Sequence, residues 1–364
     1  MSASSGRTVL IVGAGLLGAS AGLALGKAGW QVYLSDVDAR AERLAVDLGA
    51  GQAGPAGSVP DVVLVAVPPR ACTAVIEEVS RMYSNATVSD VGSVKSQVQV
   101  EVERLGVADR FVGGHPMAGR ERSGPSAARD DLFEGRPWVL CPSDATSQER
   151  IELITELVRD CGGQPISMSP RIHDDAVARV SHSPQLLASM LAAQLLAAPA
   201  GEIELAGQGL RDTVRVAGSD PALWVDILSS NAGAVAVVLS GVAADLQGVI
   251  AELQSVERQT AKSTNSPLPL LTGVLQRGRE GYERIPGKHG APATTYAVVP
   301  VVIPDEPGAL ARLLAAAGEA GINVEDIAIE HSPGQPVGLV ELSVAPESVT
   351  DLSSALAGMG WAVH

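Results

Sequence analysis

The sequence predicts an α/β domain, then an all-α domain, then a small α+β domain. Three observations support this order. From residue 8 to about residue 168, short β-branched runs alternate with Ala- and Leu-rich helical stretches, as in a parallel sheet covered by helices. From residue 170 to about 284 the strand signals vanish, and apolar residues recur at helical spacing. Strand and helix patterns then alternate again toward the C-terminus.

The first domain is expected over residues 1–169. Its first strands are the near-continuous apolar runs Val9–Val12, Val32–Leu34 and Val62–Val67. Near-continuous apolar runs are typical of strands buried on both faces, because helices cover each side of a parallel sheet. The pattern predicts an open sheet whose ligands bind at the carboxyl ends of the strands.

The second domain is expected to be all-helical over residues 170–285. Asp220 ahead of Pro221 predicts a helix start, with a capping side chain before a proline in the first turn. The pattern then runs to about Gln254, some 50 Å at ~1.5 Å per residue. A helix so long and so rich in Ala, Val and Leu has more apolar surface than one small domain covers. We therefore expect a homodimer formed through this domain.

The third domain is expected over residues 297–364, after a linker at 286–296 that is rich in Pro and Gly. Its elements follow the strand-helix-strand-strand-helix-strand order of ferredoxin-like folds. Strands are expected at Ala297–Ile303, Ile322–Ile329, Gly338–Val344 and Trp361–Val363, and helices at Gly308–Glu319 and Val349–Ala357.

Composition narrows the partners and the compartment. The three cysteines, Cys72, Cys141 and Cys161, are far apart, so neither a disulfide framework nor a zinc site is indicated, and a reducing cytoplasm fits best. A formal net charge of −15 opposes nucleic-acid binding. The N-terminus lacks the pattern of a secretory signal. We also expect that no apolar run approaches the roughly 18 residues of a membrane span. We expect small-molecule partners, no membrane and no bound metal.

A glycine-rich motif, GAGLLG at residues 13–18, follows the first strand and opens a helix. With Asp36 closing the second strand, it predicts a Rossmann-type dinucleotide site. The glycines allow a tight turn, close approach of the backbone to a pyrophosphate, and close helix packing, while the helix N-terminus attracts the anion. Asp36 favours NAD over NADP by accepting from a ribose diol, although Arg40 blurs this preference; an ordinary strand-end turn residue is the alternative. The expected cofactor-binding residues are Gly13, Gly15, Leu16, Leu17, Gly18 and Asp36.

Two polar segments follow later strands of the same domain. The segment 113–124, GGHPMAGRERSG, places His115 on a loop at the sheet edge where ligands bind. A histidine there suits general acid-base chemistry near neutral pH. The segment 89–95, SDVGSVK, brings Ser93 to a neighbouring strand end, although a helix N-cap is the alternative for this serine.

Together with DTVR at residues 212–215, these segments resemble the prephenate dehydrogenase family. In that family the G-x-G-x-x-G, G-S-V-K, G-G-H-P-x-A-G-x-E-x-S-G and D-x-x-R motifs occur in this order. The segments 305–310, DEPGAL, and 321–324, GINV, further resemble an ACT domain, a ferredoxin-like regulatory module that commonly binds amino acids. The resemblance covers nearly the whole chain, from about Thr8 to Val363.

The resemblance implies an NAD-dependent oxidative decarboxylase of prephenate on the tyrosine pathway. His115 matches the general base that removes the proton of the substrate hydroxyl, and Ser93 would hydrogen-bond the same hydroxyl. Arg215 matches the group that clamps a substrate carboxylate through a bidentate fork. Asp212, three residues earlier, would orient the guanidinium if the stretch is helical; a solvated salt bridge is the alternative. We expect His115 and Arg215 to face each other across one cleft, with the nicotinamide beside them.

Other positions leave the substrate open between prephenate and arogenate. Glu121 matches an acid at the substrate end, or is a solvated loop carboxylate. Arg120 stands where some relatives carry a small polar residue, and Gln185 stands where some carry a histidine. His182 is either a helix residue at the domain interface or close to substrate, and Pro184 kinks or starts a helix.

The sequence is also compatible with two other functions. A β-hydroxyacid dehydrogenase also joins a nucleotide-binding domain to a helical one, but that class usually relies on a lysine at the catalytic helix. A non-catalytic sensor would bind NAD and report amino-acid levels through residues 297–364. The presence of His115, Ser93 and Arg215 together argues for an enzyme. An amino-acid effector is expected at the ACT-like segment, on the basis of residues 305–308 and Asn323.

Overall fold

The computed structural model divides into two compact units, Met1–Ala244 and Asp245–His364. This division differs from the three domains expected from the sequence, whose limits stay a prediction. The described residues are 6–54, 59–119, 123–259, 268–286, 296–331 and 337–364.

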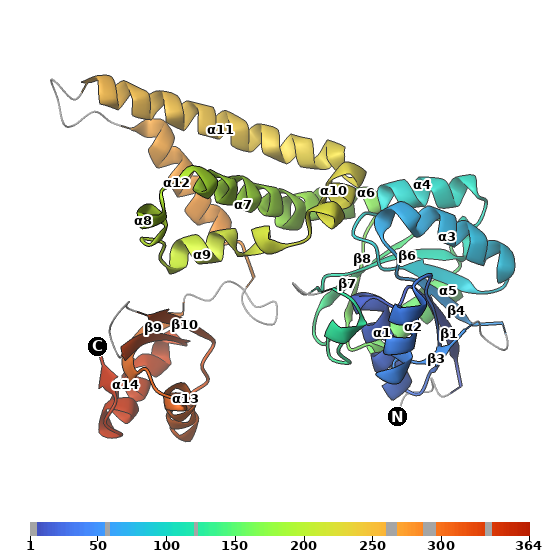
Figure 1. Ribbon diagram of the computed structural model, residues 1–364, viewed down its shortest axis with the longest axis horizontal. Helices are drawn as coiled ribbons and strands as arrows, with labels where there is room; N and C mark the ends of the chain where they lie inside the picture. Colours follow the sequence, from blue (N-terminus) through green and yellow to red (C-terminus); the bar gives the residue numbers. More distant parts are fainter. Residues whose placement is uncertain (1–5, 55–58, 120–122, 260–267, 287–295, 332–336) are drawn as a thin grey trace. The chain divides into compact units, whose positions relative to one another are not determined.

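The first unit is built on an eight-stranded sheet with the order β3-β2-β1-β4-β5-β6-β7-β8 (Figure 1). Neighbouring strands are parallel except at β6 and β7, which are antiparallel, so the expected all-parallel sheet is wrong at this edge. The described residues between these two strands form only the short 3-10 helix η2, Pro125–Ala127, and an antiparallel return needs no helical crossover. The strands are β1 Thr8–Val12, β2 Gln31–Ser35, β3 Gln52–Ala53, β4 Val62–Val65, β5 Thr87–Asp90, β6 Phe111–Pro116, β7 Pro137–Pro142 and β8 Gln164–Ser167.

Apolar side chains fill both faces of this sheet, as its continuous apolar strands predict. On one face, Val9 and Ile11 of β1 pack in a core with residues of α1 and α5. On the other face, Leu10 of the same strand packs in a second core with residues of α3 and α4. Alternate residues of a strand point to opposite faces, so β1 supplies both cores. The helices are α1 Leu16–Lys27, α2 Ala39–Asp47, α3 Pro69–Met82, α4 Ser96–Arg104 and α5 Gln148–Asp160, with the 3-10 turn η1 Ala108–Arg110.

After β8 the described chain is helical up to residue 286, as expected. Pro170 lies in the first turn of α6, where Ser169 accepts a hydrogen bond from the backbone N–H of Ile172. Pro184 lies in the first turn of α7, directly after a π-helical turn, which confirms that a helix starts there. The elements are α6 Pro170–Val177, η3 Ala178–His182, α7 Ser183–Gln194, η4 Leu195–Ala197, α8 Ala200–Ile203, α9 Gln208–Val214, η5 Arg215–Gly218, α10 Pro221–Ser230 and α11 Ala232–Gln259.

The single long helix expected from residue 221 to about 254 is wrong, because the structure has two helices separated at Asn231. The helix start is confirmed: Asp220 caps α10 by accepting from the backbone N–H of Ala222. Asn231 leaves the helical conformation, with φ −120° and ψ 28°. Its side-chain amide donates to the backbone oxygen of Asp174 and lies 3.1 Å from Nδ1 of His182. Helical periodicity continues through this position, so the apolar pattern does not reveal the break.

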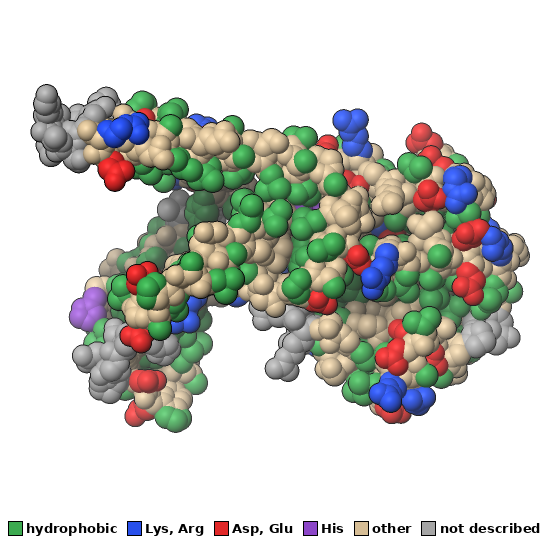
Figure 2. All heavy atoms as spheres, turned by 45° about the horizontal axis from the view of Figure 1, so that its top comes forward, with side chains coloured by type: hydrophobic (Ala, Val, Ile, Leu, Met, Phe, Trp, Pro, Cys, Tyr) green, Lys and Arg blue, Asp and Glu red, His purple; other side chains and the backbone are tan. Residues whose placement is uncertain are grey.

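The helix α11 leaves a long apolar surface exposed. Among the described residues, its segment Ala232–Arg258 is the one helix long and apolar enough, by length and composition, to cross a membrane, and only 6% of its apolar stretch is buried. The expectation that no apolar run approaches such a length is therefore wrong. Figure 2 shows hydrophobic side chains along this helix. They include Val237, Leu246, Ile250 and Leu253.

The second unit contains α12, Pro269–Tyr282, and a four-stranded antiparallel sheet with the order β10-β11-β9-β12. The side chain of Glu252 accepts hydrogen bonds from the first backbone N–H groups of α12, at Leu270 and Leu271. The sheet and its two helices follow the expected element order and enclose a core of their own. The elements are β9 Ala297–Pro304, α13 Ala309–Glu319, β10 Asp326–His331, β11 Val337–Val344, η7 Pro346–Ser348, α14 Val349–Gly358 and β12 Ala362–Val363.

Candidate active site

The glycine motif forms an open cradle at the start of α1. Gly13 has a φ of +108°, and a Cβ there would lie 2.3 Å from the backbone oxygen of Ala66. A Cβ on Gly18 would lie 1.9 Å from the oxygen of Gly13, so the helix and the turn need both glycines to pack. Gly15, the N-cap of α1, has nothing within 4 Å of its Cβ position. The open space at Gly15 beside a helix N-terminus fits a pyrophosphate, with Leu16 and Leu17 in the first turn.

Asp36 follows β2 and holds the same turn. Its Oδ2 accepts from the backbone N–H of Ala14 at 2.6 Å, and its Oδ1 accepts from the backbone N–H of Asp38 at 2.8 Å. Asp36 thus has the structural role considered for it. Because a carboxylate oxygen can accept more than one hydrogen bond, the two oxygens of Asp36 can also accept from a ribose diol.

His115 lies within β6, opposite Val139 of β7, and not on a loop as expected. The error arose from its glycine neighbours, which are buried in the sheet. A Cβ on Gly114 would lie 2.5 Å from the backbone oxygen of Asp90, so glycine lets β6 approach β5 closely. The composition that resembles a loop is a requirement of strand packing here.

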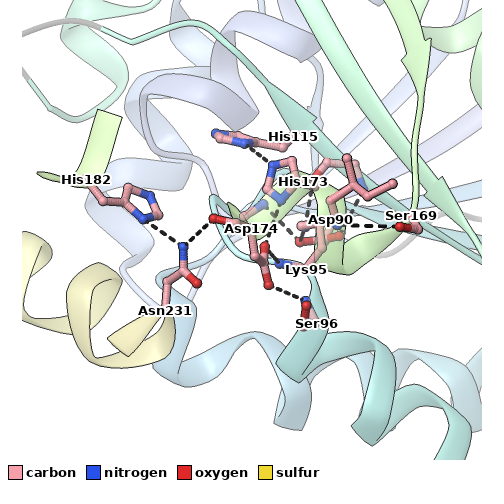
Figure 3. A network of polar contacts seen from close by, with 12 residues as sticks. Asp90, Lys95, Ser96, His115, Ser169, His173, Asp174, His182 and Asn231 are labelled. Atoms are coloured by element: carbon pink, nitrogen blue, oxygen red, sulfur yellow. Dashed lines mark hydrogen bonds and ion pairs between the residues drawn. The ribbon is translucent and has the colours of Figure 1, made fainter. Parts of the chain in front are cut away.

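The His115 ring contacts a second histidine that the sequence analysis did not single out. Its Nδ1 lies 2.8 Å from Nε2 of His173, and Nδ1 of His173 lies 2.8 Å from Oδ1 of Asp174 (Figure 3). Burial, and then the neighbouring His173 and Lys95, hold the pKa of His115 well below its usual value of 6.5. The imidazole is therefore neutral at pH 7, which is the state that accepts a proton.

A buried ion pair fixes the strands around this histidine. Lys95 Nζ pairs with Asp90 Oδ2, and both side chains are almost completely buried. Lys95 Nζ also donates to the backbone oxygen of Gly114 at 2.7 Å, while the Asp90 carboxylate accepts from the backbone N–H groups of Gly92 and Gly114. One ion pair thus positions the turn that leads to Ser93 and the residue next to His115.

Ser93 is one of the residues that line a cavity. Its Oγ is buried and has no hydrogen-bond partner among the described residues. The cavity has a volume of about 230 Å³ and is also lined by Pro69, Asp90 and Asp226. The helix N-cap alternative for Ser93 is wrong, because α4 begins at Ser96 with Lys95 at its N-cap. Buried hydroxyls are normally hydrogen-bonded, so this one is suited to a ligand.

The residues expected on the helical side lie on α7, α9 and η5. Arg215 is exposed and begins η5 directly after α9. The buried Gln185 of α7 donates to the backbone oxygen of Val216 at 2.8 Å, so its amide fixes the segment that carries Arg215. Asp212 accepts from the side chain of Gln208. The opposition of His115 and Arg215 across one cleft stays a prediction, and Arg120 and Glu121 lie outside the described residues.

His182 is a buried member of the same polar network. Its ring is stacked edge-on to Trp224 with centroids 6.2 Å apart, and Nδ1 faces the amide of Asn231. Burial lowers the pKa of His182 to about 4, so this ring is neutral at pH 7. The contacts favour the structural alternative for His182.

Comparisons with known proteins agree with these motifs. The family model of the prephenate dehydrogenase nucleotide-binding domain matches residues 21–167, and that of the prephenate dehydrogenase dimerization domain matches residues 169–263. A probable prephenate dehydrogenase, NovF of Streptomyces niveus, is 36% identical over 358 residues, which is 98% of this chain and 99% of that protein.

Two solved structures are similar in fold. Prephenate dehydrogenase from A. aeolicus, in complex with hydroxyphenyl propionate and NAD+, has a TM-score of 0.66 and 30% identity, and covers 78% of this chain and 99% of its own. Arogenate dehydrogenase from Synechocystis has a TM-score of 0.63 and 25% identity, and covers 76% of this chain and 99% of its own.

The open position at Gly15 predicts a selective defect in cofactor binding. In Gly15→Ala, the added methyl group meets no protein atom within 4 Å, so the melting temperature stays within about 2 °C of the wild type, but the methyl occupies pyrophosphate space. We expect the Kd for NAD to rise at least about tenfold, measured by fluorescence titration. Gly26→Ala, in the same helix and equally open, is the control and leaves NAD affinity unchanged. Equal NAD affinity in both variants would contradict the assigned cradle.

Proposed function

The chain belongs to the prephenate dehydrogenase family, and we propose that His115 is the general base of its reaction. The protein is an NAD-dependent oxidoreductase that oxidises and decarboxylates prephenate to 4-hydroxyphenylpyruvate. The observation that supports the proposal is the neutral imidazole of His115, whose Nδ1 is engaged by His173. Its Nε2 remains to accept the hydroxyl proton of the substrate.

The chemistry follows from the substrate. Prephenate bears a carboxylate and a pyruvyl arm on one ring carbon and a carbinol on the opposite one. NAD, when held by the glycine cradle at the start of α1, would supply the acceptor for the hydride of the carbinol carbon. His115 takes the hydroxyl proton, while Ser93 hydrogen-bonds the same oxygen and holds it against the imidazole. Once the carbinol has become a carbonyl, the ring carboxylate is that of a vinylogous β-keto acid. Loss of carbon dioxide then makes the ring aromatic.

Positioning of the substrate is assigned to the helical side. We propose that Arg215 clamps a substrate carboxylate through its planar fork, which recognises carboxylates in two parallel hydrogen bonds. Gln185 supports this role by fixing the backbone of η5 at Val216. Asp212 is proposed to orient the guanidinium, and Glu121 and Arg120 to line the end that holds the side arm of the substrate.

Arogenate is the second candidate substrate. The fold is similar to that of the Synechocystis arogenate dehydrogenase over most of this chain, and arogenate differs from prephenate only in its amino-acid arm. Gln185 cannot change charge, so it provides no titrating group that would distinguish a keto acid from an amino acid.

A homodimer is proposed through the helical region, which the dimerization-domain model matches. The exposed apolar side chains of α11 support this, because a second copy would cover them. A cytoplasmic location is also proposed: the family's enzymes act in biosynthesis, and the three cysteines are free and buried.

The sheet of residues 297–364 is proposed to be an ACT domain that binds an amino-acid effector. Its four strands and two helices have the required order. The loop before α13 turns at Gly308, with a φ of +86°, and Glu306 in this loop pairs with Arg312. Asn323 lies in the next loop after α13 and donates to Glu325. The proposed domain limits are 1–169, 170–285 and 297–364, with a linker at 286–296.

The roles of His115 and Arg215 predict two different kinetic defects. With prephenate and NAD, His115→Asn lowers kcat about a hundredfold or more, because proton removal loses its base. Arg215→Ala mainly raises KM, because the carboxylate clamp is lost. NADH formation measures both, and parallel assays with arogenate and NADP decide the substrate and the cofactor. Unchanged kinetics in both variants would refute the assignment.

The apolar face of α11 predicts that charge disrupts the dimer. Leu246→Glu combined with Ile250→Glu places carboxylates on this face, so the mass measured by light scattering should fall from twice 37.2 kDa to that value. Ser240→Glu, at an exposed polar position of the same helix, is the control and should stay dimeric. A wild-type chain that is monomeric at micromolar concentration would sink the proposal.

The ACT assignment predicts that inhibition by an amino acid can be removed without loss of dehydrogenase activity. Deleting residues 290–364 should abolish inhibition by tyrosine or phenylalanine while NADH formation persists. In the full chain, Asn323→Ala should raise the inhibitory concentration at least about tenfold without changing kcat. Inhibition that survives in both variants would place any effector elsewhere.

A further inference from the structure

Three ionisable side chains from two elements form a continuous chain of contacts that ends at His115. Asp174 and His173 are neighbours on α6, and His115 comes from β6 (Figure 3). Two contacts of 2.8 Å join them, from Asp174 Oδ1 to His173 Nδ1 and from His173 Nε2 to His115 Nδ1. His173 has no exposed surface. Both ring nitrogens of His173 are therefore committed to the other two groups.

The contacts of Asp174 determine where the protons lie. Burial alone would raise the pKa of Asp174, but hydrogen bonds from His173, from Ser96 and from the backbone N–H of Lys95 lower it below its usual value. A carboxylate only accepts hydrogen bonds, so Nδ1 of His173 carries a proton and its Nε2 carries a lone pair. That lone pair in turn requires a proton on Nδ1 of His115. The Nε2 lone pair of His115 is left to act as the base.

We infer that Asp174 and His173 form a proton relay behind His115, in addition to fixing its tautomer. The inference rests on the proposed role of His115. When Nε2 of His115 takes the hydroxyl proton, the proton on its Nδ1 passes to Nε2 of His173. His173 then holds both ring protons, and Asp174 stays ionised. No electrons leave the relay, and the reverse shift returns it to its starting state when His115 releases the proton.

The surrounding charges favour this shift. A positive charge on His115 is disfavoured by burial and by Lys95, whereas one on His173 directly contacts the Asp174 carboxylate. Of the other groups that face the pair, the ammonium of Lys95 forms an ion pair with Asp90, and His182 is neutral at pH 7. The relay places the charge beside the Asp174 carboxylate, which directly contacts His173.

The main test replaces His173 by glutamine in the full-length enzyme. In His173→Gln, the side-chain carbonyl still accepts from Nδ1 of His115 but takes up no proton. We expect kcat with prephenate and NAD to fall at least about tenfold, while KM and the Kd for NAD change less than about threefold. Asp174→Asn should have the same effect on kcat. Asp175→Asn, the same substitution one position further along α6, is the matched control with unchanged kinetics.

A double-variant cycle tests whether His173 acts through His115 or through an effect elsewhere in the fold. If His173 acts only through His115, adding His173→Gln to His115→Asn should change kcat by less than about twofold. An equal loss in both backgrounds, or an unchanged kcat in His173→Gln alone, would overturn the relay. The proposed function fails separately, if His115→Asn itself keeps wild-type turnover. If Asp174→Asn unfolds because the start of α4 loses one of its two acceptors, His173→Gln and the cycle still decide.

Discussion

The site depends on the buried ion pair of Asp90 and Lys95. Two charges removed from water are tolerated only when each is paired and its remaining hydrogen-bonding groups are satisfied. Here the carboxylate also accepts from Gly92 and Gly114, and the ammonium also donates to Gly114. These extra bonds join the end of β5 to β6. The pair therefore holds β6, which carries His115, against the end of β5, which leads into the turn with Ser93.

A second carboxylate, Asp174, joins this sheet edge to the helices that follow it. Its side chain accepts from the backbone of Lys95 and Ser96 at the start of α4, and its backbone oxygen accepts from Asn231. Lys95 thus takes part in both networks, through its ammonium in one and its backbone in the other. The break between α10 and α11, the start of α4 and the orientation of His173 are consequently coupled through a single residue. This coupling holds His173 of α6 beside His115 of β6, although the two residues are far apart in the sequence.

Local signals made much of the fold and the cofactor cradle predictable. The turn at Gly13 and the helix that follows are determined within a few residues, and the apolar runs of β1, β2 and β4 report burial on both faces. Errors occurred where a partner distant in sequence decides the outcome. His115 resembles a loop residue because β7, which pairs with β6, is more than twenty residues away. Asn231 interrupts a periodic helix because of Asp174 and His182.

The missed site residues have the same explanation. His173 and Asp174 follow an ordinary helix start at Ser169 and Pro170, and nothing in their spacing points to His115, 58 residues earlier. Lys95 belongs to the segment 89–95, and its ion-pair partner Asp90 lies five residues earlier in the same segment. The pair itself is therefore local in the sequence. Its bond to Gly114 becomes visible only when the sheet order places β5 beside β6.

A base whose pKa is depressed is a weak proton acceptor, and this agrees with the order of events in the reaction. Burial keeps His115 neutral near pH 7 but also makes its protonated form less stable. As the hydride departs, the substrate hydroxyl becomes that of a protonated ketone, which is far more acidic than an alcohol. A weak base is then sufficient to remove the proton, provided that it is already neutral and correctly oriented. The contact with His173 supplies the orientation. The depressed pKa keeps His115 neutral, and the imidazole pair keeps it oriented, so both contribute to the same step.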